Sequence, residues 1–209
     1  MKWLLIGAIF FSSFAVFSSE HNSSLSCKKN LQHLLSSINT MKADFEQISY
    51  TEKNNIHQKK QGYLLAKRPG NILWVTKSPM QQHIIADNKN IWIYDPDLEQ
   101  VTVSKFSQDL AKNPAILFIG SIENSELSYD ISCTGIRPID FILTPINTNS
   151  LYEKIELSFE NKVPLSMKLW DSLGYRSEIY FIKTQLNKVV ENNNFQFDPP
   201  EGVDLIKHK

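Results

Sequence analysis

The chain has 209 residues, with 22 basic and 22 acidic side chains and a hydrophobic fraction of 42%. This neutral balance gives no electrostatic footprint for nucleic acid or an anionic membrane, so neither is expected as a partner. The apolar fraction, with only 7 Gly and 9 Pro, excludes a disordered chain and fits one domain with a real core.

The first residues have the pattern of a secretory signal peptide. Lys2 precedes the uncharged stretch Trp3 to Phe17, and small residues follow before Glu20. A transmembrane helix needs about 20 apolar residues, so a retained membrane anchor is the weaker alternative. We therefore predict a signal peptide over residues 1–18 and a single mature domain over residues 19–209.

A first helix is predicted ahead of the strands, from Cys27 to Thr40. Apolar residues recur there at helical spacing: Leu31, Leu34, Leu35, Ile38 and Met41. This helix either packs on a sheet as an ordinary structural element or serves as a lid.

Residues 62–103 predict consecutive antiparallel strands, because short β-branched and aromatic runs are separated by Pro, Gly, Asn and Asp. Arg68 stands just before a proline at the end of an apolar strand. The pattern fits either a surface that binds an apolar ligand, with a cation near it, or a plain sheet core with a surface arginine. Four residues at alternating positions are expected to share one face: Ile72, Trp74, Trp92 and Tyr94.

A compact apolar run interrupts the strand pattern at residues 113–120. Asn113 is a good N-cap, Pro114 suits the first helical position, and Gly120 suits the C-terminal stop. Because the run has no polar face, it must be buried or must cover something. A lid would be inserted at such a place.

The second half of the chain again alternates apolar and polar residues, as at Ile155, Leu157 and Phe159. The predicted fold class is mainly β (α+β), with one large curved antiparallel sheet of about ten strands and two helical pieces. Such a sheet cannot bury its concave face alone, so the helices must cover that face.

The two cysteines of the mature chain leave two outcomes open. In an oxidising compartment Cys27 and Cys133 can pair and tie the first helix to the later strands. The restraint that this bridge would place on a lid helix favours two free thiols instead. A metal site is not expected, because no second Cys or His lies at ligand spacing from either cysteine.

An enzyme is the rival class of protein. The sequence contains no Gly-x-Ser-x-Gly and no His-Glu-x-x-His motif. Asp95-Pro96-Asp97 is typical of a turn at a strand end rather than of a metal site. We therefore predict a protein that is not an enzyme and needs no cofactor.

The chain resembles the family of periplasmic outer-membrane lipoprotein carriers, LolA. Each matching motif is short, but together they follow the family's order over nearly all of the mature chain. The related outer-membrane receptor, LolB, is itself a lipoprotein, and the missing lipid-attachment site counts against it. These residues carry the resemblance: Phe45 and Gln47, Gly62, Arg68-Pro69, Trp74, Pro79, Trp92 with Tyr94-Asp95-Pro96, Glu99-Gln100, Pro114 with Leu117, Leu143 with Pro145, Asp171 with Gly174, and Phe195-x-Phe197-x-Pro199-Pro200-x-Gly202-Val203.

The resemblance implies an unclosed β-barrel with helical lid segments over an apolar cavity, in a soluble, monomeric periplasmic protein. The cavity would take the acyl chains of lipoproteins that leave the inner membrane. The implied partners are the ATP-driven release complex LolCDE and the outer-membrane receptor lipoprotein LolB. A periplasmic lipid-binding, glycolipid-binding or sensor module of the same fold is the alternative.

By resemblance, Arg68 hydrogen-bonds to the lid and holds it shut, with partners expected among Leu117, Phe118 and Ile119. The cavity wall is expected to contain these residues: Phe45, Ile72, Trp74, Trp92, Tyr94, Ile155, Leu157 and Met167. Above it we expect Leu34, Leu35, Ile38 and Ile116. The chain departs from the family pattern at Ile72, where Phe is usual, at Asp87-Asn88, where Asp-Gly is usual, and at both cysteines.

Overall fold

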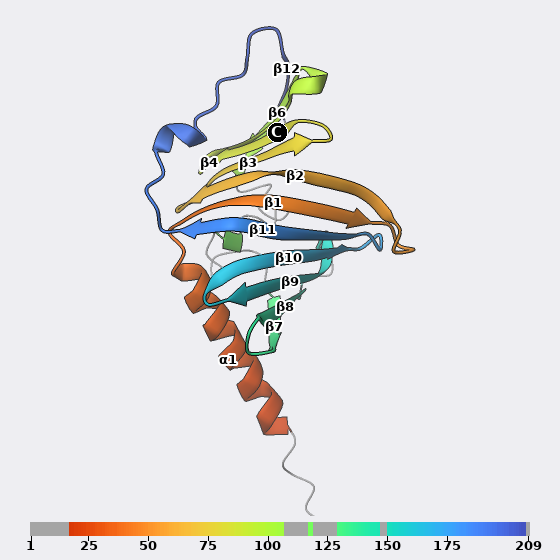
Figure 1. Cartoon of the computed structure of the whole chain (residues 1–209), viewed down its shortest axis with the longest axis vertical. Coiled ribbons are helices and arrows are strands. Elements are labelled where there is room, and N and C mark those ends of the chain that lie inside the picture. Colours follow the sequence, from red (N-terminus) through yellow and green to blue (C-terminus); the bar gives the residue numbers. More distant parts are fainter. Residues whose placement is uncertain (1–16, 107–116, 119–128, 147–149, 208–209) are drawn as a thin grey trace, which may run out of the picture.

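A large curved sheet with a long helix beside it makes up the described part of the chain (Figure 1). The structure is a computed structural model that describes residues 17–106, 117–118, 129–146 and 150–207. Helix α1 spans Phe17–Ser36. Most of the predicted helix at residues 113–120 lies outside the described residues.

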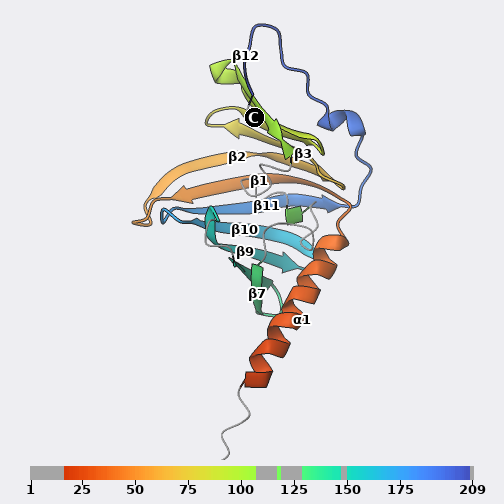
Figure 2. The same cartoon turned by 180° about the vertical axis from the view of Figure 1, so that it is seen from behind.

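Within the described residues, twelve strands form a single sheet in the order β12-β6-β5-β4-β3-β2-β1-β11-β10-β9-β8-β7. Neighbouring strands are antiparallel except β12, which runs parallel to β6. The sheet begins at β12 and ends at β7 without closing on itself (Figures 1 and 2). This confirms the predicted unclosed antiparallel sheet. The strands are β1 Thr40–Tyr50, β2 Ile56–Lys67, β3 Asn71–Ser78, β4 Gln82–Asp87, β5 Asn90–Asp95, β6 Gln100–Lys105, β7 Tyr129–Thr134, β8 Ile139–Pro145, β9 Tyr152–Glu160, β10 Val163–Asp171, β11 Arg176–Leu186 and β12 Asp204–Lys207.

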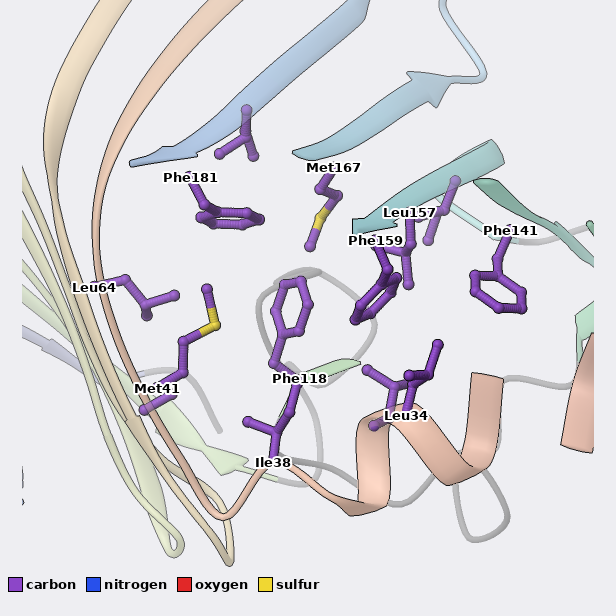
Figure 3. Packing of buried hydrophobic residues seen from close by; sticks show 14 of the residues in the cluster. Leu34, Ile38, Met41, Leu64, Phe118, Phe141, Leu157, Phe159, Met167 and Phe181 are labelled. Carbon is purple, nitrogen blue, oxygen red and sulfur yellow. The ribbon is translucent and has the colours of Figure 1, made fainter. Parts of the chain in front are cut away.

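The main core lies on one face of the sheet, the face that α1 covers, which we call the inner face (Figure 3). Phe141, Leu157 and Met167 stand opposite one another across β8, β9 and β10. Directly opposed residues of antiparallel strands share a face, so this row continues to Ile179 on β11. The predicted alternation in the second half of the chain thus produces one continuous apolar surface.

Helix α1 ends at Ser36, earlier than the predicted Thr40. The Ser37 hydroxyl donates to the Leu34 carbonyl at 2.6 Å, and such local bonds compete with helix continuation. Met41, expected to extend the helical pattern, belongs to β1 and is fully buried. The apolar spacing continues past the helix because Ile38, in the turn, and Met41, in β1, pack into the same core as the helix residues.

The C-terminal segment packs on the opposite, outer face of the sheet. The 3-10 turn η3, Asn192–Phe195, contacts β3 and β4 and buries Phe195. Further along, the Phe197 ring lies 5.8 Å from Trp92 and 5.5 Å from Tyr94, measured between ring centroids. The sheet is therefore apolar on both faces over β3 to β5.

A disulfide between Cys27 and Cys133 joins α1 to β7, with the two Cα atoms 5.6 Å apart. The Ser24 hydroxyl adds a hydrogen bond to the Ile131 carbonyl at 3.0 Å. Strand β7 lies at the edge of the sheet, so these contacts fix the helix to that edge. Of the two outcomes that the sequence left open, the structure contains the bridge.

We expect the Cys27→Ser, Cys133→Ser double variant to lose about 4–5 kcal/mol of unfolding free energy in the chain-entropy model. The reason is that the bridge spans 106 residues of sequence and so restricts the unfolded chain strongly. Urea unfolding with and without a reductant measures this loss. Reductant should destabilise the wild type and leave the double variant unchanged, and a double variant as stable as the oxidised wild type would contradict the expectation.

Candidate functional site

Arg68 lies where β2 ends and reaches across the edge of the inner face. Its backbone N–H donates to the Asn39 carbonyl at 2.9 Å, which fixes the residue beside the end of α1. Its Nε donates to the Ile38 carbonyl at 2.8 Å. Its Nη2 donates to the Leu35 carbonyl at 2.8 Å and to the Phe118 carbonyl at 3.2 Å. One guanidinium thus connects the sheet, the end of α1 and residues 117–118.

The chemistry of a helix end explains part of these contacts, because Leu35 lies in the last turn of α1 and Ile38 in the turn that follows. The Leu35 carbonyl also accepts from the Ile38 backbone N–H at 3.1 Å. The last carbonyls of a helix lack intrahelical partners and carry partial negative charge. A guanidinium presents its donors in a rigid planar fork, so it can serve several carbonyls at once. Burial lowers the pKa of Arg68, yet an arginine stays charged at physiological pH. The site is therefore a cationic cap on backbone oxygens, held at the margin of an apolar core.

The expected partners of Arg68 were backbone oxygens of residues 117–120. The structure places one bond there, at Phe118, while Leu117 packs partly buried against the core. Ile116 and Ile119 lie outside the described residues. The bonds to Leu35 and Ile38 were missed, although the end of the first predicted helix offered the same kind of unpaired carbonyls.

Phe118 occupies the centre of the core. Its side chain is fully buried and meets Phe181 edge-to-face, with 5.4 Å between ring centroids. Figure 3 shows Phe118 pointing between Met41, Phe159 and Met167, with Ile38 and Leu34 beside it. In this arrangement side chains of α1 and Phe118 fill the space over the inner face.

Most of the predicted wall residues lie together on the inner face. All are buried, and the Phe45 and Trp74 rings pack 4.4 Å apart. The wall residues found there are Phe45, Ile72, Trp74, Ile155, Leu157 and Met167. Leu34 and Leu35 of α1, with Ile38 of the turn after it, belong to the same core.

The prediction that Trp92 and Tyr94 line the inner wall is wrong, because both lie on the outer face against Phe197. Across the β4–β5 hairpin, even-numbered residues pair with odd-numbered ones. The inner face therefore carries even-numbered residues in β4 and odd-numbered residues in β5. Ile91 and Ile93 take the inner positions instead. Alternation within each strand was correct, but it does not carry across a turn whose pairing is unknown.

Two further features of the described residues bear on function. No three His, Cys, Asp or Glu side chains in these ranges lie close enough together to hold a metal ion. The search for membrane spans, made over the same ranges, finds no helix with the length and apolarity to cross a bilayer.

Comparison with known proteins gives the family. The family model "Outer membrane lipoprotein carrier protein LolA" matches residues 36–198. A protein of Hahella chejuensis is 38% identical over 180 residues, covering 85% of this chain and 86% of the relative. One of Pseudomonas aeruginosa is 34% identical over 205 residues, covering 97% and 99%. Both are named "Outer-membrane lipoprotein carrier protein".

A solved structure is similar in fold. It is an uncharacterized conserved protein from Thermus thermophilus, with a TM-score of 0.55 and 12% identity, covering 89% of this chain and 99% of that one. At that identity the likeness concerns the fold alone. The family model and the two relatives span most of the chain. The chain belongs to the LolA family of outer membrane lipoprotein carrier proteins.

Proposed function

We propose that this chain carries lipoproteins across the periplasm by covering their acyl chains with its inner face. The observation that carries the proposal is the Arg68 cap, which joins two segments above an apolar surface through three carbonyls. The side chains that cover this surface can give way to the acyl chains of a ligand. The names of the relatives supply the nature of that ligand.

The energetics explain why a carrier is needed. Each buried methylene is worth about 0.8 kcal/mol, so a multiply acylated protein does not leave a bilayer unaided. The carrier must replace most of that burial and still release its cargo. When it is empty, α1 and Phe118 bury the same surface, so cargo and lid compete for one site.

Location and partners belong to the same proposal. Removal of residues 1–18 as a signal peptide would place the domain of residues 19–209 in the periplasm as a soluble monomer. The carrier would receive cargo from the inner-membrane complex LolCDE and deliver it to the receptor lipoprotein LolB. Its role is transport, without catalysis and without a cofactor.

Trp74 and Trp92 form a matched pair for testing which face binds the acyl chains. We expect Trp74→Glu to abolish uptake of an acylated lipopeptide, because the carboxylate would lie on the apolar inner face. Trp92→Glu should retain uptake, because this residue lies on the outer face against Phe197. Binding is measured by fluorescence of a labelled lipopeptide, after circular dichroism has confirmed that both variants fold.

Loss of uptake in a folded Trp92→Glu variant, together with normal uptake by Trp74→Glu, would place the acyl site on the other face. If Trp74→Glu does not fold, Trp74→Ala replaces it. That variant should weaken binding while Trp92→Ala does not.

The Arg68 cap is tested by transfer of cargo from loaded carrier to receptor. Arg68→Leu removes a charged donor whose bonds are worth about 1.5–3 kcal/mol each, so the closed empty state becomes less favourable. We expect transfer to slow by roughly tenfold to a hundredfold, because release ends in that closed state. Arg68→Lys should restore transfer only in part, since an ammonium lacks the fork that reaches several carbonyls.

Arg137→Leu is the control for the loss of a positive charge, since Arg137 is exposed between β7 and β8. It should transfer cargo at the wild-type rate. Wild-type transfer by a folded Arg68→Leu variant would contradict the role of the cap.

A further inference from the structure

The inner face changes character along β1. Met41, Ala43 and Phe45 point into the core and are buried, whereas Gln47 and Ser49 follow on the same face and are half-buried. No irregularity interrupts the pairing of β1 with β2 between Phe45 and Ser49, so the alternation holds there. Along β1 the apolar part of the face therefore ends between Phe45 and Gln47.

Neighbouring strands extend this polar end. Lys60 of β2 stands opposite Gln47, and Gln58 stands opposite Ser49. On the other side, Ser177 of β11 pairs with Ser49, and their hydroxyl oxygens lie 3.0 Å apart. The Gln47 amide donates to the Ser49 hydroxyl at 3.4 Å. We call these five residues the polar strip: Gln47, Ser49, Gln58, Lys60 and Ser177.

The polar strip adjoins the apolar surface directly. Gln47 pairs with Ile179, which continues the row of Met167 and Leu157 across β10 and β9. A ligand on the inner face would therefore meet hydrocarbon side chains first, and then amide, hydroxyl and ammonium groups. These groups donate hydrogen bonds, and the ammonium of Lys60 can only donate.

The opposite end of the same strands is closed by the chain itself. There Arg68 caps α1, and the Asn187 amide donates to the Ser37 carbonyl at 2.9 Å. The Thr40 hydroxyl donates to the Lys188 carbonyl at 2.6 Å, and Lys67 donates to the Val190 carbonyl at 2.8 Å. Figure 1 shows the β1–β2 hairpin extending from the sheet at the end away from these contacts.

We propose that the polar strip binds the carbonyl oxygens that join the acyl chains of a lipoprotein to its first residue. The cargo polypeptide then leaves the carrier over the β1–β2 hairpin. This inference rests on the proposed function. It adds the end of the inner face at which the cargo polypeptide leaves the carrier. Burying the ester and amide carbonyls at the head of an acylated N-terminus without hydrogen-bond donors costs free energy. The strip supplies donors where the apolar surface ends.

Photo-crosslinking tests this direction, with a benzophenone amino acid introduced at one position at a time. Positions 47 and 60 belong to the polar strip on the inner face. Their sequence neighbours Ile48 and Lys59 lie on the outer face, which makes them matched controls. The carrier is loaded with a triacylated lipoprotein, irradiated, and digested for mass spectrometry. We expect several-fold more crosslinks at 47 and 60 than at 48 and 59.

The site of attachment distinguishes the two sources of carbonyl oxygen. Crosslinks to the glyceryl cysteine place the ester groups at the strip, and crosslinks to the following residues place the polypeptide there. Crosslinks to the glyceryl cysteine support the proposal, whereas crosslinks confined to the following residues would support the exit path but overturn the binding of the acyl carbonyls. Equal labelling at positions 59 and 60, or none at 47 and 60, overturns it.

A probe at position 74 keeps the proposed function separate from this inference. Crosslinks from position 74 to acyl chains, without any from 47 or 60, would leave lipoprotein carriage intact and refute the exit path. No crosslinks from position 74 in loaded carrier would instead refute acyl binding by the inner face.

A substitution without any probe gives an independent measurement. Gln47→Leu with Lys60→Leu leaves the apolar surface untouched, so binding of a simple fatty-acyl probe should not fall. Binding of a triacylated lipopeptide should weaken about tenfold, as expected for the loss of two hydrogen bonds. Lys59→Leu is the control and should bind both ligands normally. Equal binding of the lipopeptide by the double variant and the wild type would overturn the proposal.

Discussion

The bonds from Arg68 to backbone carbonyls are the interaction on which the closed arrangement depends. A curved open sheet exposes an apolar face too large to remain uncovered in water. In this chain α1 and Phe118 cover it, and one guanidinium connects both to the end of β2. The cap acts on backbone atoms, so it constrains where these segments lie without adding polar side chains to the core. This combination suits a surface that must be covered when empty and available when loaded.

The disulfide adds a second constraint on the same helix. Cys27 fixes the middle of α1 to the edge strand β7, while Arg68 holds the C-terminal end of the helix. Breaking the bonds of Arg68 alone therefore does not release α1 from the sheet. The restraint that made the bridge doubtful from the sequence is present in the structure.

Much of the architecture could be predicted from local pattern. Alternation at Ile155, Leu157 and Phe159 identified the inner positions of β9, because one face of that strand is buried and one is wet. Signals of this kind can be read within one strand or one turn, without knowledge of its partners in the fold. The position of Arg68 before a proline, at the end of an apolar strand, left a plain surface arginine open, and its role as a cap was expected only from the resemblance to the family.

The predictions that failed concern features that depend on contacts between secondary-structure elements. The faces of Trp92 and Tyr94 are set by the pairing of β4 with β5, which alternation within β5 does not reveal. Met41 continued a helical spacing because the core draws apolar residues from a turn and a strand as readily as from a helix. The C-terminal segment that covers Trp92 is distant in sequence, and its Phe197 gave no signal of that partner.

The central claim is that the inner face binds the acyl chains of lipoproteins. Native mass spectrometry of the carrier, purified from the periplasm without detergent, tests it most directly. The account predicts a complex with one acylated polypeptide, which dissociates into the carrier and a protein bearing fatty acyl groups. Phospholipid or glycolipid as the bound ligand, with no acylated polypeptide, would contradict it.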